Sequence, residues 1–82
     1  MSYRVLIDID CLSVLPRSGK RRDEVISFCS RLADNLYDDS DFQITEPESR
    51  RVVEVSVRQG YAITWWIDAP VKRVVIIDIR QV

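Results

Sequence analysis

The stretch Tyr61-Ala62-Ile63-Thr64-Trp65-Trp66-Ile67-Asp68 decides the fold class of this 82-residue chain. Its residues alternate so that Ile63, Trp65 and Ile67 share one face and Ala62 and Trp66 share the other, which predicts a strand over 61–67. The breaks on either side, Gln59-Gly60 and Asp68-Ala69-Pro70, are short enough to force hairpins. The stretch is therefore expected to be the middle strand of an antiparallel meander, with flanking strands at 51–58 and 71–80.

The residues before the meander predict one strand, two helical segments and a loop. Alternation over 3–9 indicates a first strand, and Asp10 is expected to cap a short helical turn that ends at Leu15. From Ser18 the apolar period becomes 3.6, which predicts an amphipathic helix of about 18 residues. A surface loop is expected from 38 to 49. The first strand should place Tyr3, Val5, Ile7 and Ile9 on one face, and the helix should place Val25, Phe28 or Cys29, Leu32 and Leu36 on one face.

These elements predict a single α+β domain over residues 1–82. A chain of this length buries only about 60% of its unfolded surface, so a second domain is excluded. The order of elements is strand, short helix, long helix and three strands. We expect the helices to pack on one face of a twisted antiparallel sheet.

The other face of this sheet also requires a cover. The run Val74-Val75-Ile76-Ile77 places apolar groups on both faces of the last strand, and Trp66 points away from the helix side. An exposed apolar patch of this kind indicates a partner chain. Alternatively, the 38–49 loop or a second copy of the chain covers it. The predicted partner surface comprises Trp66, Lys72, Arg73, Val74 and Ile76.

The sequence lacks the usual residues of catalytic and metal centres. It contains no histidine, which removes the commonest general base and metal ligand. The acidic run of Asp38, Asp39 and Asp41 is better explained as a solvated loop than as a weak cation site, and Asp8 and Asp10 as capping and strand-end charges. No metal or cofactor is expected.

The cysteines and the hydropathy pattern indicate a protein of the cytoplasm. Cys11 and Cys29 lack the spacing of a metal site, and no secretory signal precedes them, so we expect buried thiols. The longest apolar run, Val74 to Ile77, is too short to span a bilayer.

Basic side chains form two groups, although the net charge of −1 argues against a general affinity for nucleic acid. Each group offers a place for a phosphate or an acidic segment to dock. The first lies at the start of the long helix (Arg17, Lys20, Arg21, Arg22). The second surrounds the meander (Arg50, Arg51, Arg58, Lys72, Arg73, Arg80).

Several of these local patterns together resemble the RelE/ParE superfamily of bacterial toxins. They are Leu15-Pro16-Arg17, the helix end Arg31-Leu32-Ala33-Asp34-Asn35, and above all Tyr61-Ala62-Ile63-x-Trp65-Trp66-x-Asp68 followed by Val71-Lys72-x-Val74-x-Ile76. The resemblance covers nearly the whole chain. It implies the toxin of a type II toxin–antitoxin pair, with helices on a twisted sheet and an antitoxin wrapped around it. Some members cleave messenger RNA in the ribosome and others poison DNA gyrase.

The chain departs from the ribonuclease members of this superfamily. The position after Tyr61, often Arg in those enzymes, is Ala62, and the chain ends in Arg80-Gln81-Val82 without a terminal Tyr or His. Only Arg50, Arg51, Arg58 and Arg80 are left to face a phosphate. The favoured interpretation is therefore a binding toxin of the ParE kind. The alternatives are a ribosome-dependent endoribonuclease and a non-toxic interaction module, which would also fit a homodimer.

Overall fold

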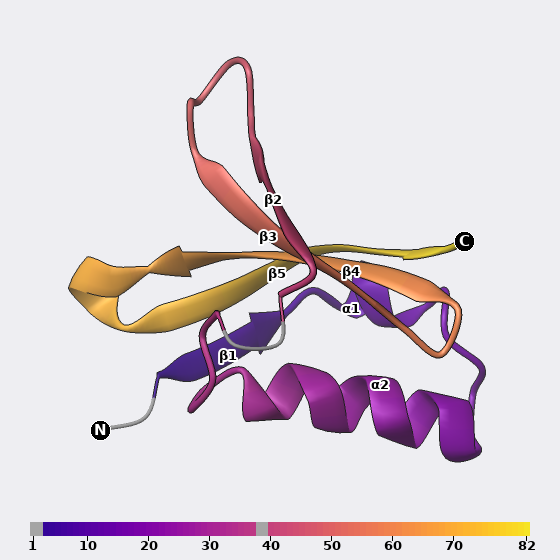
Figure 1. Ribbon diagram of the computed structural model, residues 1–82. Helices are drawn as coiled ribbons and strands as arrows, with labels where there is room; N and C mark the ends of the chain where they lie inside the picture. The colour runs from indigo at the N-terminus through magenta and orange to yellow at the C-terminus, as the bar shows by residue number, and fades with distance from the viewer. Residues whose placement is uncertain (1–2, 38–39) are drawn as a thin grey trace.

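The computed structural model describes residues 3–37 and 40–82, which form an α+β fold with a five-stranded mixed sheet. The elements are β1 (Arg4–Ile7), α1 (Ile9–Leu12), α2 (Lys20–Arg31), β2 (Phe42–Thr45), β3 (Val52–Arg58), β4 (Tyr61–Asp68), the 3-10 turn η1 (Ala69–Val71) and β5 (Arg73–Gln81). The long helix α2 lies along one face of the sheet, and the β2–β3 hairpin projects away from the other elements (Figure 1). The predicted fold class is confirmed.

The sheet has the strand order β1-β5-β4-β3-β2. Strands β2 to β5 form the antiparallel meander, and Trp65 pairs with Ile76 beside a register shift between Thr64 and Trp65. Strand β1 pairs with β5 in parallel, so the expectation of a purely antiparallel sheet was wrong. After β1 the chain passes through both helices and enters the sheet again at the opposite edge, as β2. The meander then brings β5 beside β1, and a long crossover of this kind permits the two strands to be parallel.

The first strand is shorter than predicted because α1 begins immediately after it. Asp8, not Asp10, is the N-cap of α1, and its Oδ1 accepts a hydrogen bond from the Asp10 amide at 3.0 Å. Ile9 consequently belongs to α1, where it is 79% exposed instead of lying in the core. A carboxylate cap satisfies an amide that would otherwise lack a partner, which ends the strand at Ile7.

Helix α2 buries the predicted face but has 12 residues, fewer than expected. Its buried side chains include Val25, Phe28 and Cys29. At its end the amides of Leu32 and Ala33 bond to carbonyls three residues back, which tightens the chain into turns. Beyond the helix, Leu32 is buried and Leu36 still packs against the core.

The core lies between α2 and the sheet. Trp65 is its largest fully buried side chain; its ring meets that of Phe28 edge-on with centroids 5.8 Å apart, and its Nε1 donates to the Leu36 carbonyl at 3.2 Å. The indole is therefore both packed and hydrogen-bonded, as a buried Trp requires.

Strand β2 occupies part of the segment that was expected to be a loop from 38 to 49. Residues 38 and 39 of that segment lie outside the described part of the chain. The Phe42–Thr45 strand pairs with β3, and all four of its side chains are exposed. An edge strand with no buried face gives only a weak pattern in the sequence, because burial produces the alternation that identifies a strand.

Candidate interaction surface

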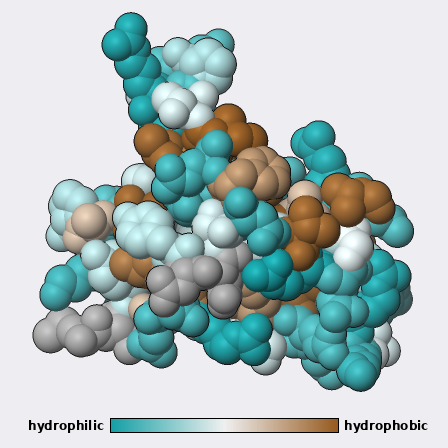
Figure 2. Space-filling model, in the orientation of Figure 1, coloured by the Kyte–Doolittle hydropathy of each residue, from teal (hydrophilic) through white to brown (hydrophobic). Residues whose placement is uncertain are grey.

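The sheet face opposite α2 carries the half-buried side chain of Trp66. The predicted alternation is confirmed, since Trp65 is completely buried against α2 and its neighbour points the other way. Figure 2 shows apolar side chains gathered at the base of the β2–β3 hairpin. On the Trp66 side of the sheet, Phe42 and Ile44 of β2 are each about half exposed. This surface extends outward from the sheet, and no helix covers it (Figure 1).

Arg51 holds Trp66 in place. Its guanidinium lies over the indole ring, with Cζ 4.6 Å from the ring centroid. Its Nε also donates to Glu46 Oε1 at 2.7 Å, and this hydrogen bond is the main cause of the lowered pKa of Glu46. The same carboxylate oxygen accepts from Ser49 Oγ at 3.1 Å. The predicted phosphate-binding Arg51 is thus occupied by an intramolecular ion pair and an aromatic face.

The prediction that Val74 and Ile76 lie on the partner-facing side was wrong. Both are buried in the core, because Val74 pairs with Ile67 and Ile76 pairs with Trp65 on the side that α2 covers. The intervening Val75, which pairs with Trp66 and is only partly buried, belongs to the opposite face. Of the apolar residues predicted for a partner, only Trp66 is available there.

Lys72 and Arg73 lie where η1 leads into β5. Lys72 has a left-handed backbone, with φ of 54°, and its side chain is exposed. Arg73 Nη2 donates to Asp68 Oδ2 at 2.9 Å, while its Nε is buried with no hydrogen-bond partner among the described residues. These two cations border the Trp66 face near the start of β5.

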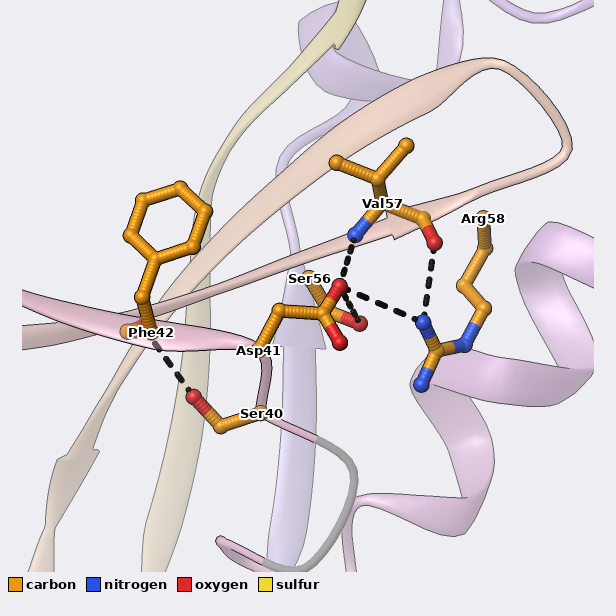
Figure 3. A network of polar contacts seen from close by, with 6 residues as sticks. All are labelled: Ser40, Asp41, Phe42, Ser56, Val57 and Arg58. Carbon is orange, nitrogen blue, oxygen red and sulfur yellow. Dashed lines mark hydrogen bonds and ion pairs between the residues drawn. The ribbon is translucent and has the colours of Figure 1, made fainter.

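Arg58 takes part in a polar network at the start of β2 (Figure 3). Asp41 Oδ2 accepts from the Val57 amide at 2.8 Å, from Ser56 Oγ at 3.2 Å and from Arg58 Nη1 at 3.4 Å. These bonds, first of all that from the Val57 amide, lower the pKa of Asp41. The Arg58 guanidinium also lies 4.7 Å from the ring centroid of Phe28. Asp41 therefore ties the start of β2 to β3, so its role is structural.

The four arginines considered for phosphate binding do not converge. Arg50 and Arg51 precede β3 and Arg58 ends it, which at about 3.3 Å per residue separates Arg51 from Arg58 by roughly 23 Å. Arg80 is on β5, where its highly exposed side chain approaches Asp78, with Nε and Oδ2 3.5 Å apart. The structure therefore brings no cluster of these side chains together around one phosphate.

The basic group at the start of α2 fastens the helix to its surroundings. Arg21 donates to the Gln59 carbonyl through Nη2 at 2.8 Å, and its guanidinium lies 5.0 Å from the ring centroid of Tyr61. Arg22 donates to the Pro16 carbonyl at 3.1 Å, and Lys20 forms an exposed pair with Glu24. Arg17 is also exposed.

The thiols and carboxylates show no centre for a metal. Cys11 and Cys29 are free, and burial raises the pKa of Cys29 to about 12. Residues 3–37 and 40–82 contain no group of three or more Cys, Asp or Glu side chains placed to hold an ion. Asp38 and Asp39, once considered for a weak cation site, lie outside the described residues. No helix in the same ranges is long and apolar enough to cross a membrane.

Comparison with solved structures identifies the architecture. The chain superposes on a chain of the RelBE2 toxin–antitoxin complex from Mycobacterium tuberculosis with a TM-score of 0.77, over 100% of both chains and at 19% sequence identity. The chain has a RelE-like fold. No family model and no curated protein matches its sequence.

Within this RelE-like fold, a groove lies beside α1 that the sequence analysis did not predict. Its volume is about 680 Å³, and its lining includes Leu6, Asp10, Cys11, Val75 and Asp78. Asp8 and Asp10, two of its lining residues, were explained from the sequence only as a helix cap and as charges at the end of a strand. The signal available in the sequence was the spacing of three apolar residues near the start of the chain, Leu6, Ile9 and Val14. In the structure all three are exposed.

Proposed function

We propose that the chain is the toxin component of a type II toxin–antitoxin pair, and that it acts by binding a macromolecular target. The observation that carries this proposal is the RelE-like fold combined with an uncovered sheet face that presents Trp66. Trp66 is only partly buried and is fixed by a cation over its ring. A partly accessible tryptophan lowers the solubility of a folded chain, and it is expected where a partner covers it.

The side chains favour binding over messenger RNA cleavage. A ribonuclease needs a group to remove the proton from the 2′-hydroxyl and cations to stabilise the phosphate, all within hydrogen-bond reach of one site. This chain has no histidine, and its candidate arginines lie at opposite ends of β3 and on β5. Arg51 and Arg58 are moreover held by Glu46 and Asp41. Of the two activities in the superfamily, we therefore propose gyrase poisoning of the ParE kind.

The antitoxin is proposed to neutralise the chain by covering its exposed apolar surfaces. A segment that spreads over the Trp66 face buries side chains that the described chain leaves open, including Phe42 and Ile44. Removal of such apolar area from water is the main favourable contribution to association.

The proposal is tested with the purified protein in two parallel assays. The first measures supercoiling of relaxed plasmid by DNA gyrase, and the second measures integrity of a messenger RNA in a translating bacterial extract. We expect inhibition of gyrase and an intact messenger RNA. Cleavage within codons of the translated message would overturn the binding mechanism in favour of the endoribonuclease.

A variant with Trp65→Ala serves as the control, because it empties part of the core and so lowers the population of folded protein without changing a side chain of the open face. If neither assay responds to the folded wild-type protein, the toxin proposal fails, and the chain is instead an interaction module with this fold.

A further inference from the structure

The groove beside α1 lies where β1 ends and β5 continues. Strand β1 pairs with β5 only as far as Ile76, while β5 runs on to Gln81. Beyond Ile76 the described chain places no further strand on that edge, and α1 passes beside it (Figure 1). The space of about 680 Å³ beside it is lined by residues of β1, α1 and β5, among them Leu6, Ile7 and Cys11.

The groove has an apolar floor and unusually exposed apolar sides. Val75 and Ile77 of β5 line it. Leu6 and Val14 also line it and are 37% and 45% exposed, and Ile9, which lies between them in the chain but is not part of the lining, is 79% exposed. Three exposed aliphatic residues within a nine-residue stretch bring an apolar patch to the surface, and such patches mark sites of association.

Three carboxylates surround this apolar floor. Asp8, Asp10 and Asp78 all line the groove, and no Lys or Arg is among the described residues that do so. Their fields converge on the Cys11 thiol, whose pKa is raised first by burial and then by these three charges. Arg80 approaches Asp78 from outside at 3.5 Å, but its side chain is 77% exposed, so solvent screens this pair. The groove therefore combines apolar walls with negative charge.

We propose that this groove binds a segment of the antitoxin in which apolar side chains are flanked by Lys or Arg. The apolar side chains occupy the floor formed by Val75 and Ile77, and the cations meet Asp8, Asp10 and Asp78. Apolar contact supplies affinity, while the opposite charges select the segment and fix its register. The identity of the partner rests on the proposed function, whereas the chemistry that the groove selects rests on its lining alone.

The test uses a fluorescein-labelled synthetic peptide in which Leu alternates with Lys. Two matched peptides replace either every Lys by Glu or every Leu by Ser. Fluorescence anisotropy with the full chain measures affinity, and amide shifts in a ¹⁵N spectrum locate the binding. We expect the Leu/Lys peptide to bind more tightly than both others and to shift the amides of Leu6, Cys11 and Ile77.

The protein variants separate the groove from general attraction between opposite charges. Asp10→Asn with Asp78→Asn should weaken binding of the Leu/Lys peptide by about three- to tenfold, the value of two partly screened charge contacts. Asp23→Asn, an exposed carboxylate on α2, is the control and should leave the affinity unchanged. Asp8 is left intact because it caps α1.

Several results would overturn the inference: equal affinity for the Glu peptide, shifts confined to the Trp66 face, equal weakening by Asp23→Asn, or no binding. These outcomes are distinguishable from failure of the proposed function. If the protein poisons gyrase but does not bind the peptide, the toxin proposal stands and the groove proposal fails. If the protein binds the peptide in the groove but affects neither gyrase nor messenger RNA, the groove proposal stands and the toxin proposal fails.

Discussion

Arg51 lies over the indole ring of Trp66, with its Cζ 4.6 Å from the ring centroid, while Glu46 holds the same guanidinium through a 2.7 Å hydrogen bond. Arg51 immediately precedes β3, and Trp66 lies in the neighbouring strand β4 on the sheet face that α2 does not cover. A cation over an indole contributes about 0.5–1 kcal/mol at a partly exposed position. The pair therefore fixes the orientation of Trp66 while leaving part of the indole accessible to another molecule.

The two adjacent tryptophans should respond oppositely to substitution. Trp65→Ala should lower the free energy of unfolding by about 3–5 kcal/mol, because it empties the core and leaves the Leu36 carbonyl without its donor. Trp66→Ala should cost about 1 kcal/mol, mainly its contact with Arg51. Urea unfolding followed by circular dichroism measures both. A larger loss for Trp66→Ala would place that side chain in the core.

Replacement of Trp66 by Glu should separate binding from folding. The charged side chain on the open face should abolish binding of an antitoxin, while the circular dichroism spectrum of the variant remains that of the wild type. Ser27→Glu, an exposed position on α2 and away from this face, is the matched control for added charge. Unfolding of the Trp66→Glu protein would show that the face is not open.

Stability should decline in acid through Asp41 and Glu46. Both carboxyls have pKa values below their ordinary values of 3.8 and 4.5, through the Val57 amide and Arg51 respectively. Their contribution is fully present above the unfolded-state pKa and is lost as pH falls through the lower folded-state pKa. Urea midpoints measured from about pH 6 to about pH 3 should therefore decrease. In Asp41→Asn this decrease should be shallower. An unchanged pH profile would show that the hydrogen bonds to Asp41 do not contribute to stability.

The β3–β4 turn should tolerate substitution at only one of its two positions. Gly60 has φ of 80°, and an added Cβ would lie 3.1 Å from Arg21 Nη2, so Gly60→Ala should destabilise the fold by about 1 kcal/mol or more. Gln59 already has φ of 54°, and Gln59→Asn should be neutral or stabilising, since Asn-Gly suits a two-residue hairpin turn. Thermal unfolding distinguishes them. Equal melting temperatures for both variants would contradict this turn geometry.

The two thiols should react slowly and at different rates. Cys29 is fully buried with a pKa of about 12, so it should resist iodoacetamide at about pH 8, where free cysteine reacts readily. Cys11 is only partly buried and should be modified first. Intact-mass spectrometry over time counts the modifications, and Cys11→Ser assigns them. Rapid modification of Cys29 in the native protein would contradict its burial.

The sequence predicted the elements whose side chains alternate between a buried and an open face. Strand β4 is the clearest case, because Ile63 and Trp65 against Ala62 and Trp66 determine both its register and its orientation. Strand β5 gave no such signal. Its run Val74 to Ile77 is apolar on both faces, so only its pairing with β4 shows that Val74 and Ile76 belong to the core.

The parallel pairing of β1 and the interaction surfaces depend on tertiary structure. Nothing local to residues 4–7 distinguishes a parallel from an antiparallel neighbour, since the choice depends on where the helices return the chain. Arg51 and Trp66, or Asp10 and Asp78, become neighbours only through folding. The sequence therefore showed which basic or acidic residues lie close together along the chain. It could not show which residues each of them contacts in the fold.

The central claim, that this chain is a toxin acting by binding, is tested most directly by inducing it alone in a bacterial host and recording growth together with a DNA-damage reporter. Wild-type protein should arrest growth and activate the reporter, and Trp65→Ala should do both less strongly, because its emptied core lowers the population of folded protein. Continued growth while folded wild-type protein accumulates would contradict the claim.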